Sequence, residues 1–158
     1  MKARTLLPFL LFLLGCGDDS PPLGLSPQVV DMGWVDFHTE ACMNCECSEG
    51  CAQTEVALTN LTEGEVTATM GAFDTDYICV EGYTGSETEL GTMNSGSRFL
   101  FKISACDYGA GELNLEGQED PTPAEGSIAF HSDASDESIL LTWSFLPFRN
   151  QGGVDTAQ

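Results

Sequence analysis

Basic residues are scarce in this 158-residue sequence, which has five Lys and Arg against 25 Asp and Glu and a formal charge of −20. Such an acidic chain repels phosphate groups, which argues against nucleic acid as a partner. Long apolar stretches are also missing, since the run Leu6–Leu14 is far shorter than the roughly 20 residues of a membrane-spanning helix. Histidine occurs only twice, and no nucleophile, zinc-protease or phosphate-loop motif is present. We therefore expect no catalytic residue, no enzyme activity and no cofactor.

The N-terminus has the features of a secretory signal, because two basic residues precede the short apolar run and a small residue follows it. Leu13-Leu14-Gly15-Cys16 is similar to a bacterial lipobox, in which the cysteine thiol receives a diacylglyceryl group and the chain is cut before that cysteine. The resemblance implies that residues 1–15 are a lipoprotein signal peptide and that Cys16 carries the lipid, including palmitate. The paired prolines at 21 and 22 oppose the alternative, an ordinary membrane helix.

Cleavage before Cys16 would leave three basic residues and a formal charge of about −22. Because anionic headgroups repel this charge, the covalent lipid is the expected contact with the membrane. Residues 16–27 are rich in Asp, Ser, Pro and Gly and are predicted to form a flexible tether. The expected location is the bacterial cell envelope, at the outer membrane, facing the periplasm or the cell surface. A hydrophobic content of 42% with nine Phe favours a folded domain over disorder.

Six of the seven cysteines remain after Cys16 is set aside, and an even number in an exported chain favours disulfides. A direct bridge between Cys45 and Cys47 would be strained. Cys79 and Cys106 could pair with each other or with the Cys-rich insert, residues 38–53. The alternative is a zinc or copper site, because clustered thiolates bind soft metals. The disulfide candidates are Cys42, Cys45, Cys47, Cys51, Cys79 and Cys106, and the alternative metal ligands are Cys42, Cys45, Cys47 and Cys51.

Short segments of alternating apolar and polar residues fill the rest of the chain, with turn residues between them and no helical period. Residues 98–105 are the clearest, with Phe99, Phe101 and Ile103 on one side. Residues 55–60 and 65–70 are predicted to form a hairpin, and Gly33 a bulge. No strand is predicted between residues 82 and 97. The pattern predicts a β-sandwich with strands at 28–37, 55–60, 65–70, 77–80, 98–105, 111–117, 126–131 and 137–145.

The order of several short motifs resembles the ASH/Hydin-like immunoglobulin-fold domain over about residues 25–146. These motifs are Ser26-Pro27, Val30-Asp31-Met32-Gly33, Val56-Ala57-Leu58-Thr59-Asn60, Gly96-Ser97 before Phe99-Leu100-Phe101, and Gly126-Ser127-Ile128-Ala129-Phe130-His131-Ser132-Asp133. The resemblance implies an all-β, immunoglobulin-like antiparallel β-sandwich over residues 28–146, which contains the Cys-rich insert. Residues 147–158 are expected to be a disordered tail. The cysteine segment and residues 107–125 depart from the family pattern.

This family carries no catalytic residues, so the resemblance implies a binding or scaffold role. The expected function is that of a lipid-anchored cell-envelope protein with a non-catalytic immunoglobulin-like domain. Its expected partner is an envelope protein or polysaccharide, and it would contact the membrane through the covalent lipid. The alternative function is a metal-binding lipoprotein that uses the cluster from Cys42 to Cys51.

Overall fold

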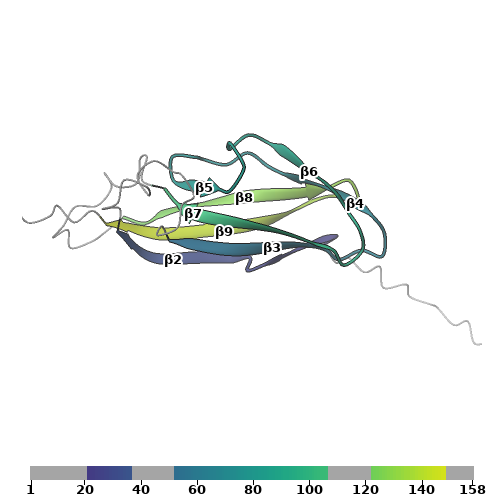
Figure 1. The fold of residues 1–158 in the computed structure, drawn as a ribbon, viewed down its shortest axis with the longest axis horizontal. Coiled ribbons are helices and arrows are strands. Elements are labelled where there is room, and N and C mark those ends of the chain that lie inside the picture. Colours follow the sequence, from purple (N-terminus) through teal and green to yellow (C-terminus); the bar gives the residue numbers. More distant parts are fainter. Residues whose placement is uncertain (1–20, 37–51, 107–121, 149–158) are drawn as a thin grey trace, which may run out of the picture.

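The computed structural model describes residues 21–36, 52–106 and 122–148, which form two β-sheets packed face to face (Figure 1). The strands are β1 (Leu23–Ser26), β2 (Val29–Asp36), β3 (Gln53–Asn60), β4 (Val66–Met70), β5 (Ile78–Val80), β6 (Thr88–Met93), β7 (Arg98–Ala105), β8 (Ala124–Ser132) and β9 (Ser135–Phe148). Within these ranges there is no helix whose length and hydrophobicity would allow it to cross a membrane. The predicted all-β class is confirmed.

The strand order is that of an immunoglobulin-like sandwich. One sheet has four strands in the order β1-β3-β7-β5, and the other has five in the order β2-β9-β8-β4-β6. All neighbouring strands described are antiparallel except β2 and β9, which run parallel. The sandwich is thus antiparallel, as predicted, apart from this one parallel pair. Because β2 and β9 are the first and last strands of their sheet in sequence, no hairpin turn dictates their relative direction.

Alternating side chains from both sheets meet in one hydrophobic core. The rings of Phe101 on β7 and Phe130 on β8 stack across it with centroids 5.5 Å apart. Full burial of such side chains contributes roughly 1.5–3 kcal/mol each to the free energy of unfolding. Of the residues predicted on the inner side of 98–105, Phe101 and Ile103 are buried and Phe99 is half-buried against the core. The most buried residues also include Val30, Val56, Leu58, Val66, Ala68, Met70, Ile78, Ile128, Phe130, Leu141 and Phe145.

The predicted hairpin of residues 55–60 and 65–70 is wrong. Both segments are strands, but β3 pairs with β1 and β7, whereas β4 pairs with β6 and β8 in the other sheet. The connecting residues carry the chain from one sheet to the other. Alternation alone could not reveal this, because both strands direct their apolar side chains into the same core.

The predicted irregularity at Gly33 is confirmed. Gly33 has a φ of 61°, its N–H donates to the Asp31 carboxylate at 2.9 Å, and the pairing of β2 with β9 shifts between Asp31 and Trp34. The extra residue changes the phase of the alternation. Val30 and Val35 are consequently both buried, although an odd number of positions separates them.

Two strands lie where the sequence predicts none. β1 occupies part of the predicted tether, with Leu23 only 2% exposed, and β6 occupies part of the predicted loop and turn. Both are edge strands: β1 has only four residues, too few to establish an alternation, and the pairing of β6 with β4 shifts between Ala68 and Thr69, which interrupts the period of two. β9 also continues to Phe148, inside the predicted tail. The predicted strand at 111–117 lies outside the described residues.

Candidate functional site

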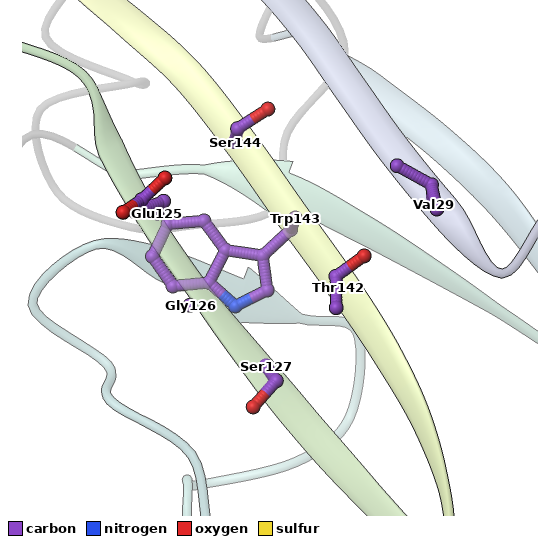
Figure 2. Close-up of a pocket in the computed structure, with 7 residues that line it drawn as sticks. All are labelled: Val29, Glu125, Gly126, Ser127, Thr142, Trp143 and Ser144. Atoms are coloured by element: carbon purple, nitrogen blue, oxygen red, sulfur yellow. The ribbon is translucent and has the colours of Figure 1, made fainter.

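A shallow depression of about 470 Å³ lies where β2, β9 and β8 run side by side in the five-stranded sheet (Figure 2). Its lining residues are Val29, Glu125, Gly126, Ser127, Thr142, Trp143 and Ser144. A second depression of about 300 Å³ shares Glu125 and is lined by Tyr77, Thr122, Pro123, Ala124 and Glu125. The first offers more polar side chains and is the better candidate for a binding site.

Strand register places the polar residues of this depression together. Thr142 on β9 lies opposite Val29 on one side and Ser127 on the other, and Ser144 lies opposite Glu125. Successive side chains of a strand point to opposite faces. Because Leu141, Trp143 and Phe145 of β9 are buried, Thr142 and Ser144 face outward. The hydroxyl groups therefore line the outer face of the sheet.

Trp143 packs beneath this surface and depends on a neighbouring glycine. A Cβ at Gly126 would lie 2.5 Å from Cζ2 and 2.9 Å from Cε2 of the indole, so no larger residue fits without displacement. Figure 2 shows the indole lying across β8 at Gly126. The ring is 4% exposed and stacks on Tyr77 and Phe145, with centroids 6.3 and 5.9 Å away. Its Nε1 has no hydrogen-bond partner among the described residues. Trp143 thus supports the depression from the core side.

The chemistry of the depression suits reversible polar contacts. Ser127, Thr142 and Ser144 supply hydroxyls that both donate and accept hydrogen bonds, and Glu125 supplies a carboxylate. Val29, 66% exposed, adds an apolar rim. No group of three His, Cys, Asp or Glu placed to hold a metal occurs among the residues that the structure describes.

Outside the depression, burial raises the pKa of the Tyr83 hydroxyl above its usual 10.0, so this group remains neutral near pH 7.

Leu140 extends the apolar part of this face. It lies two residues before Thr142 on β9, opposite Ala129 of β8, and is 44% exposed. Leu140, Thr142 and Ser144 thus share the outer face of β9, opposite the buried Leu141. We call Val29, Ser127, Leu140, Thr142 and Ser144 the β2–β9–β8 face.

The cysteines predicted to carry lipid or metal, namely Cys16, Cys42, Cys45, Cys47 and Cys51, lie outside the described residues. These predictions therefore stay predictions.

The two cysteines within the described ranges, Cys79 on β5 and Cys106 after β7, are disulfide-bonded. Cys79 lies opposite Ser104, which places Cys106 at the diagonal position of the antiparallel pair. Diagonal residues are about 7–8 Å apart, whereas disulfide Cα atoms are usually about 4.4–6.8 Å apart. The register therefore favours sulfur partners elsewhere in the chain for both cysteines.

The acidic turns and the glycosylation-like motif have structural roles. The Asp74 carboxylate accepts from the Asp76 N–H at 2.9 Å, and the Asp133 carboxylate accepts from the Thr67 N–H at 2.8 Å. Asn60, which begins Asn60-Leu61-Thr62, is the last residue of β3 and is buried. His131 is exposed on β8, and His38 lies outside the described ranges.

Sequence reasoning did not identify the depression. Ser127, Thr142 and Ser144 are ordinary outward-facing strand residues, and nothing in their spacing distinguishes them from other solvent-facing positions. The alternation over residues 139–145 reveals which of them face outward, but not that three strands bring them together.

No protein-family model and no curated protein matches this chain. Similar solved structures include an ASH/PapD-like domain of human CEP192, with 10% identity, a TM-score of 0.46 and coverage of 96% of this chain and 99% of that one. The periplasmic chaperone SfaE has 12% identity and a TM-score of 0.43, with 82% of this chain and 58% of the chaperone covered. The CooA pilin subunit of enterotoxigenic Escherichia coli has 13% identity and a TM-score of 0.42, with 82% and 99% covered. At these values the immunoglobulin-like description rests on the strand order itself.

Proposed function

We propose that this protein is a lipid-anchored component of the bacterial cell envelope whose immunoglobulin-like sandwich is a non-catalytic binding or scaffold domain. The observation that carries the binding role is the β2–β9–β8 face, where exposed apolar side chains border a row of hydroxyls. Such a mixture of apolar and polar groups is typical of surfaces that bind other macromolecules.

The N-terminal motif supports the anchoring part of the proposal. With lipid on Cys16 and β1 beginning at Leu23, about seven residues separate the membrane from the sandwich. Fully extended, that segment spans roughly 20 Å, at about 3.3 Å per residue. The domain would therefore stand close to the membrane, which we take to be the outer membrane.

The proposed partner is an envelope protein or polysaccharide that contacts the β2–β9–β8 face. Hydroxyl groups and one carboxylate suit sugar hydroxyls, and Val29 and Leu140 suit apolar side chains. A photo-reactive amino acid at position 142, introduced into the full chain in living cells, tests the proposal. Position 92 is the control, because Thr92 is an exposed threonine of β6, at the far edge of the same sheet.

We expect a cross-linked adduct from position 142 and none from position 92, and we expect Leu140→Glu to abolish it. Protease or glycosidase sensitivity of the adduct separates a protein partner from a polysaccharide. Equal adducts from both positions, or none from position 142, would contradict the proposal. Stoichiometric zinc or copper retained by the dialysed protein would support the metal-binding alternative instead.

A further inference from the structure

Strand β7 has a neighbour on both sides along only part of its length. On one side β3 pairs with it from Arg98 to Ser104. On the other side β5 pairs only with residues 103–105, and the Glu81 N–H then donates to the Lys102 carbonyl at 3.1 Å. Figure 1 shows β5 beside one end of β7 only. The edge of β7 at Arg98 and Leu100 is therefore uncovered by the part of the chain that the structure describes.

Along this edge, the main-chain N–H and C=O groups of alternate residues point sideways in the plane of the sheet, away from β3. The Lys102 carbonyl faces the β5 side, and alternate residues of a strand present their N–H and C=O to the same side. Leu100 and Arg98 thus face the same open side. The Ser97 carbonyl, in contrast, accepts from the Asn60 N–H on the β3 side at 3.1 Å. An unpaired row of this kind is a template for another strand.

The side chains along this edge have a distinct character within an acidic protein. Arg98, Leu100 and Lys102 are all exposed on the outer face, and Arg98 and Lys102 are the only Arg and Lys residues in the described ranges. Leu100 is 56% exposed.

The residues of β3 that pair with Lys102 and Arg98 determine how much of each positive charge is offset. Glu55 lies opposite Lys102 and offsets its charge, whereas Arg98 lies opposite the neutral Thr59. Neither cation forms an ion pair with a residue in the described ranges. The net positive charge of this edge of β7 therefore lies at Arg98. The charge of Lys102 is offset by Glu55, and Leu100 is uncharged.

We propose that an extended peptide of a partner protein adds as a strand along the Arg98–Leu100 edge of β7. The main-chain groups supply the affinity, and cross-strand neighbours set the preference for an apolar side chain opposite Leu100 and an acidic one opposite Arg98. Charges beyond about 8 Å are screened at physiological salt, so Arg98 outweighs the distant acidic residues. Repulsion between copies with a formal charge of −20 disfavours a second copy of this chain as the occupant. The edge shares no residue with the β2–β9–β8 face, so the two proposals fail separately.

The probe is a fluorescein-labelled peptide with the core Val-Leu-Val-Glu, which in antiparallel pairing sets Leu against Leu100 and Glu against Arg98 and stops short of Lys102, where Glu81 already pairs. Its binding to the full-length protein is measured by fluorescence anisotropy. Two control peptides carry either Lys in place of Glu or an N-methyl group on the Leu. The protein variants are Arg98→Glu, Leu100→Ala and, as the matched control outside both proposed binding surfaces, Leu61→Ala, because Leu61 is also 56% exposed.

We expect the N-methylated peptide not to bind, because it lacks the N–H that faces β7. The Lys peptide should bind roughly 2- to 30-fold more weakly, since one surface ion pair becomes a repulsion of similar size. Arg98→Glu should reverse the preference between the two peptides, Leu100→Ala should weaken both, and Leu61→Ala should change neither. Absence of binding, or binding insensitive to N-methylation and to Arg98→Glu, would overturn the proposal. Self-association of the protein that competes with the peptide would assign the edge to a second copy and also overturn it.

Discussion

Asn60 shows how one buried polar residue connects the two sheets. Its side-chain amide donates to the carbonyls of Gly64 and Met93 at 2.8 and 2.9 Å. Its side-chain oxygen accepts from the N–H and the hydroxyl of Thr62, both at 2.8 Å. All the hydrogen-bonding groups of the amide are therefore satisfied, although the residue is 1% exposed. These bonds join the turn after β3 to the end of β6.

We expect Asn60→Ala to lower the free energy of unfolding by roughly 2–4 kcal/mol, because it removes the Asn60 donor from the buried Met93 carbonyl and leaves a cavity in its place. Urea unfolding followed by circular dichroism measures the loss. Asn94→Ala is the matched control, since Asn94 is exposed, and it should cost about 0.5 kcal/mol or less. Equal stability of the two variants would show that the Asn60 network contributes little.

At the scale of elements, the disulfide-bonded cysteines of the described residues lie on β5 and directly after β7. Cys79 and Cys106 lie on neighbouring strands, and their diagonal register favours partners elsewhere in the chain. Apart from Cys16, the remaining cysteines of the sequence lie within Cys42–Cys51. Bridges from both positions would join this Cys-rich segment to the β5–β7 edge.

We therefore expect non-reducing peptide mapping to link Cys79 and Cys106 each to a peptide from residues 42–51, and denatured protein to show no reactive thiol. Each such bridge contributes roughly 2–4 kcal/mol in the loop-entropy model. Added reductant should expose residues 39–53 to protease first and leave β7 uncut, because Phe101 and Ile103 are held by the core. A Cys79–Cys106 peptide would disprove the pairing. Four reactive thiols holding a metal would favour the zinc or copper alternative.

At the scale of the whole molecule, a covalent lipid would be the principal contact with the membrane, because the formal charge of −20 opposes binding to anionic headgroups. We expect Cys16→Ser to leave the precursor uncleaved by the lipoprotein peptidase, or to release the protein into the soluble fraction if another peptidase acts. Ser20→Ala is the control and should not alter fractionation. Membrane fractionation with detergent extraction and electrophoretic mobility reports the result. A processed, detergent-extracted Cys16→Ser protein would refute the lipobox prediction.

The sequence by itself was sufficient for the class of fold and for much of the core. Alternation over β7 identified Phe101 and Ile103 as inward residues, and Gly33 marked the bulge in β2, because both signals are local. Strands β1 and β6 were not predicted, because a local signal needs enough buried apolar side chains in one segment. These short edge strands bury too few to alternate clearly.

Only the tertiary structure decided which strands are neighbours. Strands β3 and β4 are consecutive but belong to different sheets, and β2 pairs in parallel with β9 from the far end of the described chain. The β2–β9–β8 face and the open edge at Leu100 both follow from these pairings. Alternation specifies which side of a strand is buried, but hydrogen bonds between strands use main-chain groups common to all residues except proline. Partner and direction are therefore set by how the whole set of strands closes around one core.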